Sequence, residues 1–230
     1  MYKQIVAVLA AFAGMTTLVP TGRAQVAACD IPDATVTYLQ SQLAPVVQNG
    51  NGGIFSPNRM WSAVVDRKGR LCSVTSIGDA WPGSRAIAIA KASTANDFSN
   101  SGLALSTANL YAPTQPNGSL YGLNNSNPFN PAFLPQASGI GYVPGGVITF
   151  GGGVALYQGG QVIGGLGVSG DSSCADHSVA YRMRRNASLN GIPGGVAADG
   201  TDNIIYADRG KPVDPTTFQH PHCFASDVVP

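Results

Sequence analysis

The chain has 230 residues, and 13 Lys and Arg residues against 12 Asp residues give a formal net charge of +1. Charged residues make up only 11% of the chain and hydrophobic residues 44%. The sequence can therefore bury a core, and it lacks the charge excess of nucleic-acid binders and disordered tails. It contains no Glu, which excludes the HExxH metalloprotease helix.

The first 24 residues have the organisation of a secretory signal peptide. A basic start precedes an apolar run over 5–19, and the small residues Gly22 and Ala24 suit cleavage after Ala24. A run of about 15 apolar residues is too short to span a bilayer, so we expect no membrane span. A lipoprotein cleavage box at 26–29 is the alternative, which the polar residues before it disfavour. The sequence predicts a periplasmic or secreted protein with a single domain over 25–230.

Four cysteines, Cys29, Cys72, Cys174 and Cys223, remain in the exported chain. An even number in such a chain suggests two disulfides, for which three pairings exist. We favour Cys29–Cys72 and Cys174–Cys223, because each closes a loop of about 40 to 50 residues, worth ~3–4 kcal/mol in the loop-entropy model. A four-cysteine zinc site is disfavoured because the sequence contains no CxxC pair.

The first half of the exported chain predicts helices on either side of a hairpin. Apolar spacing over 33–48 predicts a first helix. Short strands over 60–66 and 70–76 flank a Lys-Gly turn and are typical of a hairpin. A second helix is predicted over 81–99, and a short third helix over 105–111.

The second half opens with the stretch 112–146, which is rich in Pro and Asn and shows no apolar periodicity. We interpret it as a long loop inserted in the domain, of the kind that forms lids or contact surfaces. Strands over 147–150, 153–157 and 161–168 follow, and then a last helix over 173–189. Hairpins supply the strands, so the sequence predicts an α+β fold with a central antiparallel sheet and helices packed on it in three layers.

The segment 165–170 matches the GxGxxG pattern. A dinucleotide site would need a βαβ unit around it, and the preceding strand here belongs to a hairpin. We favour close packing of glycine backbone, while leaving open an anion site at the helix start, where Asp171 would compete.

The next residues raise two further interpretations. Gly170-Asp171-Ser172 resembles a serine-protease nucleophile turn over three residues only, which gives a catalytic triad little support. We interpret the segment from Ser173 to Asp176 as a capping box that opens the last helix.

Three histidines form a conditional cluster. If Cys174 bonds Cys223, then His220 and His222 must lie beside the start of the last helix, near His177. Three imidazoles there, with the Asp176 carboxylate, could hold a transition metal. The competing interpretation is a disulfide-pinned tail with surface histidines, and a metal-dependent hydrolase at this place would lack a Glu base.

The second helix carries a polar pair within an apolar stripe. At 100° per residue, one face contains Ile87, Ala90, Lys91, Thr94 and Phe98. A Lys that extends to solvent and a Thr bonded to its own helix would explain the pattern. A pocket wall would explain it too, with apolar contacts for a flat ligand, a cation for its carboxylate and a hydroxyl near its centre.

Several segments together resemble the GlcG/HbpS-like secreted haem-binding family. They are the KASTA motif at 91–95 with Phe98, and the glycine-rich segments 151–156 and 164–170. The similarity extends over about 33–189. It implies a profilin-like three-layer α/β/α sandwich, frequent homo-oligomers, and haem binding with slow oxidative haem degradation reported for some members.

The resemblance also implies a site. The family's proposed iron-contacting threonine corresponds to Thr94, Lys91 and Arg85 would attract the propionates, and Ile87 and Phe98 would contact the ring together with Tyr111 or Tyr121. A hydroxyl is a poor iron ligand, so binding by Thr94 alone would be weak. The sequence hypothesis is an exported haem-binding protein with turnover left open. The alternative is a non-enzymatic periplasmic small-ligand-binding or oligomeric assembly module, and neither involves nucleic acid.

Overall fold

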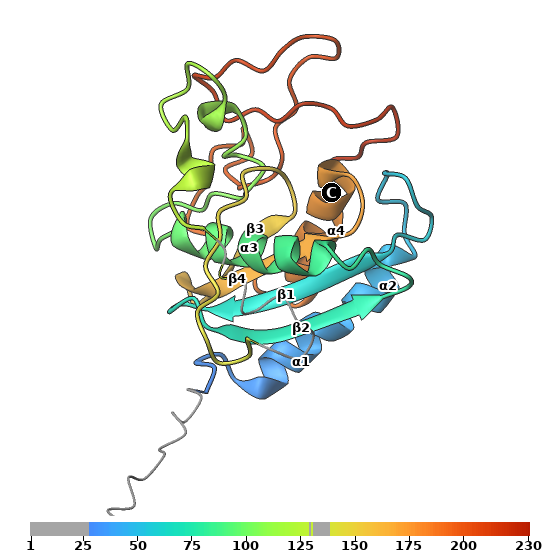
Figure 1. Cartoon of the computed structure of the whole chain (residues 1–230), viewed down its shortest axis with the longest axis vertical. Coiled ribbons are helices and arrows are strands. Elements are labelled where there is room, and N and C mark those ends of the chain that lie inside the picture. The colour runs from blue at the N-terminus through green and yellow to red at the C-terminus, as the bar shows by residue number, and fades with distance from the viewer. Residues whose placement is uncertain (1–27, 129, 131–138) are drawn as a thin grey trace, which may run out of the picture.

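The computed structural model describes residues 28–128, 130 and 139–230 (Figure 1). The expected signal peptide at 1–24 lies outside the described residues. Among those that are described, no helix is both long enough and apolar enough to cross a membrane.

Four antiparallel strands form one sheet in the order β2-β1-β4-β3. Two hairpins supply them, β1 (Met60–Asp66) with β2 (Leu71–Ile77), and β3 (Gly153–Gln158) with β4 (Gln161–Ser169). The hairpins join where β1 pairs with β4, from Trp61 opposite Ser169 to Asp66 opposite Gly164. Each outer strand also makes one bridge to irregular chain: Leu71 of β2 pairs with Ile140, and Tyr157 of β3 pairs with Asn190.

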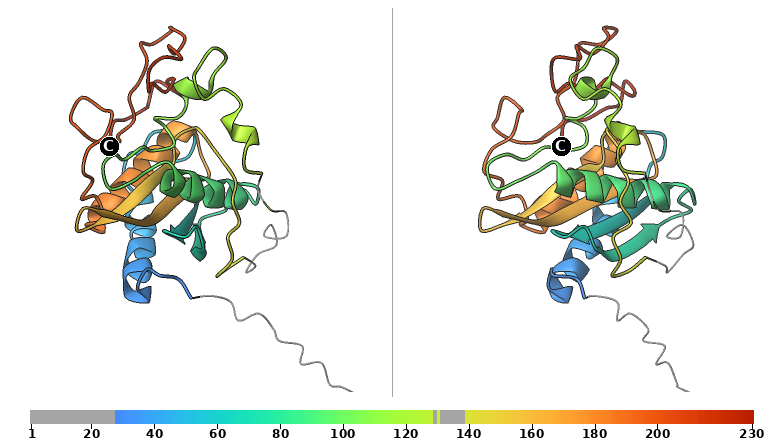
Figure 2. Two further views of the ribbon diagram at one scale, coloured as in Figure 1. Left: turned by 90° about the vertical axis from the view of Figure 1, so that its left-hand side faces the viewer. Right: turned by 60° about the vertical axis from the view of Figure 1, so that its left-hand side comes forward.

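Helices cover both faces of this sheet, so the predicted three-layer α+β architecture is confirmed (Figures 1 and 2). One face packs against α1 (Asp33–Ser41), α2 (Leu43–Val47) and α4 (Ser173–Asn186), and the other face packs against α3 (Ser84–Asp97). Alternation along the strands separates the two cores. The first contains Met60, Val64, Val154, Leu156, Leu166 and Val168, and the second contains Trp61, Ala63 and Val65 with Ala88, Ile89 and Ala92.

Glycines allow α3 to lie directly on the sheet. A Cβ at Gly167 would run into the carbonyl oxygen of Ala88 and come within 2.5 Å of the Ala92 nitrogen. Cβ atoms at Gly153 and Gly165 would likewise meet helix backbone, at Lys91 and Ala92. Gly165 and Gly167 of the GxGxxG pattern thus serve close helix–sheet packing, and a Cβ at Gly170, at the turn into α4, would meet the Arg59 carbonyl, so the predicted close packing of glycine backbone is confirmed.

Three predicted elements differ from the structure. The helix expected over 33–48 is two helices that meet at Gln42, because Pro45 has no N–H to continue the hydrogen-bond ladder. The helix expected over 105–111 is a series of turns, which Asn109 fixes by accepting from the Ser106 backbone N–H at 3.0 Å. The strand expected over 147–150 is irregular, because the Ile148 N–H donates to a side chain, Thr94 Oγ1, at 2.9 Å.

The loop expected at 112–146 contains two short 3-10 turns, Ala112–Thr114 and Leu123–Asn125, in its described part. The tail after α4 returns beside it on the α3 side of the molecule (Figure 2). The Ala112 N–H donates to the Gln219 carbonyl and joins the two segments, and the Ala104 N–H, earlier in the chain, donates to the Gly194 carbonyl of the tail.

Both expected disulfides are present. Cys29–Cys72 ties the start of the described chain to β2, and Cys174–Cys223 ties the tail to the first turn of α4.

Candidate functional site

Lys91 is fully buried and already has an anionic partner. Its Nζ donates to Asp176 Oδ2 at 2.7 Å and to the Val168 carbonyl at 3.1 Å, and it lies 4.8 Å from the centre of the Phe150 ring. Burial lowers the pKa of the Lys91 ammonium. The expectation that Lys91 attracts a ligand's propionate is therefore wrong for this conformation, because its charge is directed at a carboxylate inside the protein.

Asp176 links α3 to the start of α4. Its Oδ1 accepts the backbone N–H groups of Gly170 at 3.1 Å and Asp171 at 3.0 Å, and burial raises its pKa to about 6. The capping box expected from Ser173 is wrong by one residue. Ser172 is the N-cap, and its hydroxyl accepts the Ala175 N–H at 3.3 Å.

Thr94 is fully buried beneath the segment 146–149, which we call the strap. Its Oγ1 donates to the Ala90 carbonyl at 2.7 Å and accepts the Ile148 N–H at 2.9 Å. Arg85 is also buried, whereas Ile87 and Phe98 are half-buried. The structure thus keeps these residues on α3, with Phe98 directly after its end, but covers the hydroxyl that was expected to face an iron.

The two loop aromatics do not form a common wall. The Tyr111 ring lies 5.0 Å from the His220 ring, and Tyr121 is 70% exposed. Neither the position of Tyr111 nor that of Tyr121 supports the expectation that these side chains cover a ring bound on α3.

The three histidines are separated by their own partners. His177 Nε2 lies 3.2 Å from Asn203 Oδ1 and accepts the Ile204 N–H, while His222 stacks on Tyr206 with ring centres 4.2 Å apart. Only His220 belongs to a group of converging ligand atoms among the described residues, and its companions are Cys174 and Cys223. The predicted three-histidine metal cluster is therefore not formed.

Asp171 organises a loop rather than a catalytic triad. Its carboxylate accepts the backbone N–H groups of Ile54 at 2.6 Å and Phe55 at 2.9 Å and the side-chain amide of Asn58 at 3.1 Å. Since Ser172 caps α4, the nucleophile turn suggested by Gly170-Asp171-Ser172 has no support in the structure.

The loop that Asp171 holds forms one wall of a surface hollow of about 370 Å³. Its lining is mostly apolar, with a single cationic side chain, Arg59. The guanidinium of Arg59 lies 4.8 Å from the centre of the Phe55 ring, and the Phe55 ring meets Trp81 edge-on at 5.6 Å. Among the described residues Arg59 forms no salt bridge. The lining residues are Val47, Gln48, Ile54, Phe55, Ser56, Pro57, Asn58, Arg59, Ile77 and Gly78.

Sequence reasoning missed this hollow. Its residues come from the end of α2, the loop 49–59 and the end of β2, which no single periodicity joins. The available signal was the Phe-Ser-Pro-Asn-Arg segment at 55–59, an aromatic and a cation in an otherwise Gly- and Asn-rich loop.

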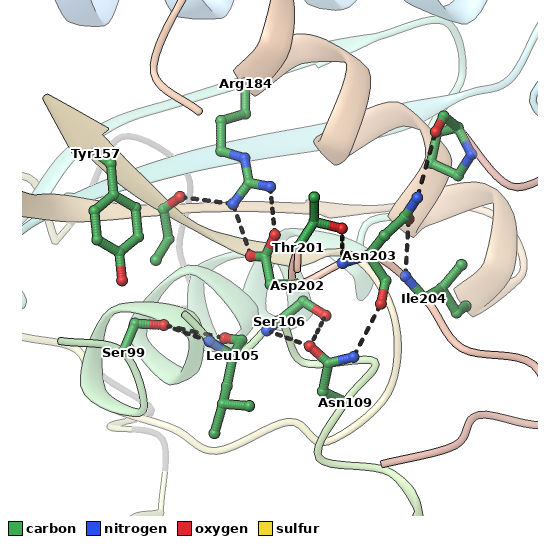
Figure 3. A network of polar contacts seen from close by, with 12 residues as sticks. Ser99, Leu105, Ser106, Asn109, Tyr157, Arg184, Thr201, Asp202, Asn203 and Ile204 are labelled. Carbon is green, nitrogen blue, oxygen red and sulfur yellow. Dashed lines mark hydrogen bonds and ion pairs between the residues drawn. The ribbon is translucent and has the colours of Figure 1, made fainter. Parts of the chain in front are cut away.

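A second polar network lies at the opposite end of α4 (Figure 3). Arg184 is buried and binds Asp202 through two N–H···O contacts, of 2.7 Å and 2.5 Å, and it also donates to the Ala155 carbonyl at 3.0 Å. Asn203 extends the network by accepting from Asn109 at its backbone carbonyl. The network joins the tail to α4 through Arg184 and to β3 through the Ala155 carbonyl, so we assign it to holding the tail in place.

Comparisons with known proteins identify a family and solved structures that this chain resembles. A family model described as haem degrading protein HbpS-like matches residues 57–184, more than half of the chain. A crystal structure of a PduOC–haem complex shares 27% sequence identity, with a TM-score of 0.51, over 68% of this chain and 94% of that one. The protein ORFY of Klebsiella pneumoniae shares 25% identity, with a TM-score of 0.53, over 69% of this chain and 90% of that one. A search of curated proteins gave no significant match.

Proposed function

Because the chain belongs to the HbpS-like family of haem degrading proteins, we propose that it binds a tetrapyrrole, with haem as the ligand to test first. Family membership is the observation that carries this proposal. The similarity to a protein solved as a haem complex supports it, since that similarity extends over nearly all of the other chain.

The hollow beside Phe55 and Arg59 is the place in the described structure that best suits such a ligand. Its volume of about 370 Å³ falls in the range of small-molecule sites, and sites of this kind combine apolar walls with a few directed polar groups. The aromatic and aliphatic side chains would contact one edge of the macrocycle. Arg59 would pair with a propionate, which a guanidinium binds with two parallel hydrogen bonds.

The α3 surface at Thr94 is the second location, in keeping with the resemblance of the KASTA helix. Arg85, Ile87 and Phe98 would contribute there, while Lys91 would stay paired with Asp176. Binding at Thr94 requires the strap to move, because the Ile148 N–H now occupies the hydroxyl. A hydroxyl ligand would leave the haem high-spin and weakly held.

Haemin titration of the full exported chain tests the function and separates the two locations. We expect the wild type to shift and sharpen the Soret band, and Arg59→Gln to weaken binding about tenfold through loss of one charge-assisted pair. Arg185→Gln is the matched control, because Arg185 is an exposed arginine outside both locations. Thr94→Val should bind like the wild type.

A wild-type spectrum identical to free haemin would overturn the proposed function. Weakened binding by Thr94→Val together with unchanged binding by Arg59→Gln would move the site to α3. The same samples followed over time with ascorbate test oxidative degradation, for which the bound Soret band must decay faster than that of free haemin.

We also propose that the protein is exported. Two disulfides are stable in an oxidising compartment and rare in a reducing one, which supports this location. Mass spectrometry of the purified protein should give an N-terminus at Gln25. A retained N-terminus in the cytosolic fraction would contradict export.

The alternative, an oligomeric assembly module, rests on one observation. The described end of the long loop exposes Ile140, Tyr142 and Val143 at 42%, 47% and 58%. Light scattering should then give a multimer that Val143→Ser weakens, and a wild-type monomer would exclude this role.

A further inference from the structure

A cluster of metal-ligating atoms lies where the tail meets the start of α4. The sulfur atoms of Cys174 and Cys223 and one ring nitrogen of His220 all lie within 4.8 Å of one another. Cys174 and His220 are buried, and Cys223 is half-buried. In the oxidised protein the two sulfurs are bonded to each other, so neither can bind a cation.

We propose that a dithiol reductant converts the Cys174–Cys223 disulfide into a zinc site formed by two thiolates and the His220 imidazole, with water as the fourth ligand. This site is independent of the tetrapyrrole location. Three protein ligands and one open position are a common arrangement for zinc.

The Cys174–Cys223 disulfide is reduced in two thiol-exchange steps. One thiolate of the reductant attacks the half-buried Cys223 sulfur and releases Cys174 as a thiolate, and the second reductant thiol then displaces Cys223. The reductant is oxidised to its disulfide, and the protein gains two electrons and two protons. Zn²⁺ binding releases the two thiol protons, so the site of one dication and two thiolates is neutral overall.

The surroundings of the two cysteines suit both the reduction and the binding of Zn²⁺. Cys174 lies in the first turn of α4, where the helix dipole stabilises a thiolate. The Cys174 N–H and the Ser173 hydroxyl already lie 3.2 Å and 3.3 Å from the Cys223 sulfur, and they remain available to a thiolate. Two thiolates on one tetrahedral zinc lie roughly 3.8 Å apart. The Cα atoms of these cysteines, 6.0 Å apart, need little movement to reach that spacing.

His220 is prepared as the third ligand. Its Nδ1 lies 2.7 Å from the Pro221 carbonyl, which can only accept, so Nδ1 carries the proton in the oxidised protein. The ring is neutral, and its lone pair on Nε2 accepts the Gly151 N–H at 3.3 Å, a single hydrogen bond that a metal would have to replace. A backbone carbonyl on one ring nitrogen is also the usual outer partner of a zinc-bound histidine.

The second disulfide provides an internal comparison. Cys29, Cys72 and Asp66 also have ligand atoms within 4.8 Å. However, the Asp66 carboxylate already accepts the backbone N–H groups of Asp30, Lys68 and Arg70. Zinc binding there would break those three bonds, whereas zinc on His220 replaces only the one from Gly151, so we expect the site at Cys174 only.

The experiment uses the full exported chain carrying Cys29→Ser and Cys72→Ser, reduced with a dithiol that is then removed by gel filtration under nitrogen. Co²⁺ reports tetrahedral thiolate ligation by absorption, and Zn²⁺ competition gives the affinity. We expect one metal per reduced chain and none in the oxidised chain. His220→Ala should weaken Zn²⁺ binding at least about tenfold, and His220→Cys should restore it with a third thiolate. Cys174→Ser with Cys223→Ser should abolish it.

Two results would overturn the proposal. One is a reduced parent without the cobalt–thiolate band. The other is His220→Ala binding as tightly as the parent, which would also be the outcome if the reduced chain had unfolded and bound metal through its cysteines alone. Circular dichroism of each reduced variant accompanies the titration and identifies that case.

Discussion

The Lys91–Asp176 pair is a fully buried ion pair whose two charges depend on each other. Lys91→Met leaves the Asp176 carboxylate buried without its cation, and we expect a loss of about 3–5 kcal/mol in the free energy of unfolding. The double variant with Asp176→Leu removes both charges and should recover most of that loss. Urea unfolding with the disulfides intact measures both. Equal losses in the single and double variants would contradict coupling between the two groups.

The burial of two histidines makes the stability of the fold depend on pH. Burial lowers the pKa of His177 and His220 to about 4. As the pH falls below their ordinary value, the unfolded chain binds protons that the folded rings refuse, so stability falls with pH. Asp176 opposes this, because its pKa of about 6 lets the folded state bind a proton before the unfolded state does.

The net change can be estimated from these three shifts. Each corresponds to about 3 kcal/mol, so two losses and one opposing gain leave a net loss of about 3 kcal/mol between pH 7 and pH 4. The urea midpoint measures it. Asp176→Asn removes the opposing gain and should steepen the loss. A midpoint that does not change with pH would contradict the assignment.

At the scale of residues, the sequence does not predict which distant group each side chain contacts. Helical spacing correctly predicted that Lys91 and Thr94 share a helix. It contained no information on Asp176, 85 residues away, or on the Ile148 N–H that covers Thr94. Both disulfides could be predicted correctly, because four cysteines allow only three pairings.

At the scale of elements, the contact between α3 and the sheet sets the spacing of two layers. Gly167→Ala would place a methyl group against the Ala88 carbonyl, backbone that cannot move aside as a side chain would. We expect a loss of about 3 kcal/mol in the free energy of unfolding, at the upper end for overpacking. Gly191→Ala is the control, because no atom lies within 4 Å of its added Cβ. Equal unfolding midpoints for the two variants would show that α3 can shift.

Element prediction succeeded where the pattern was local. The first hairpin has a clear turn signal, and β1 has the bounds that the sequence predicts. Prediction failed at 105–111 and 147–150, where apolar residues are buried by contacts with distant chain. The hollow at Phe55 was out of reach for the same reason, since Asp171 holds its loop from 116 residues away.

At the scale of the whole molecule, one disulfide, one buried ion pair and several hydrogen bonds join the tail to the domain. Asp202→Ala leaves Arg184 buried without its carboxylate, and we expect a loss of about 3–5 kcal/mol with earlier proteolysis in the tail. Asp208→Ala, an exposed carboxylate in the same tail, should behave like the wild type. Limited trypsin digestion with mass spectrometry compares them. A wild-type cleavage pattern in Asp202→Ala would show that the disulfide and the hydrogen bonds hold the tail without the ion pair.

The bridges that Ile140 and Asn190 make to the outermost strands bear on how copies of the protein can meet. An uncovered sheet margin presents a row of free N–H and C=O groups, to which a neighbouring chain can add by backbone pairing. Here the inserted loop interrupts one margin and the tail interrupts the other. Contacts between copies should therefore form through side chains on the outer surfaces, and the continuous intermolecular sheets that lead to fibrils should be disfavoured while both segments stay in place.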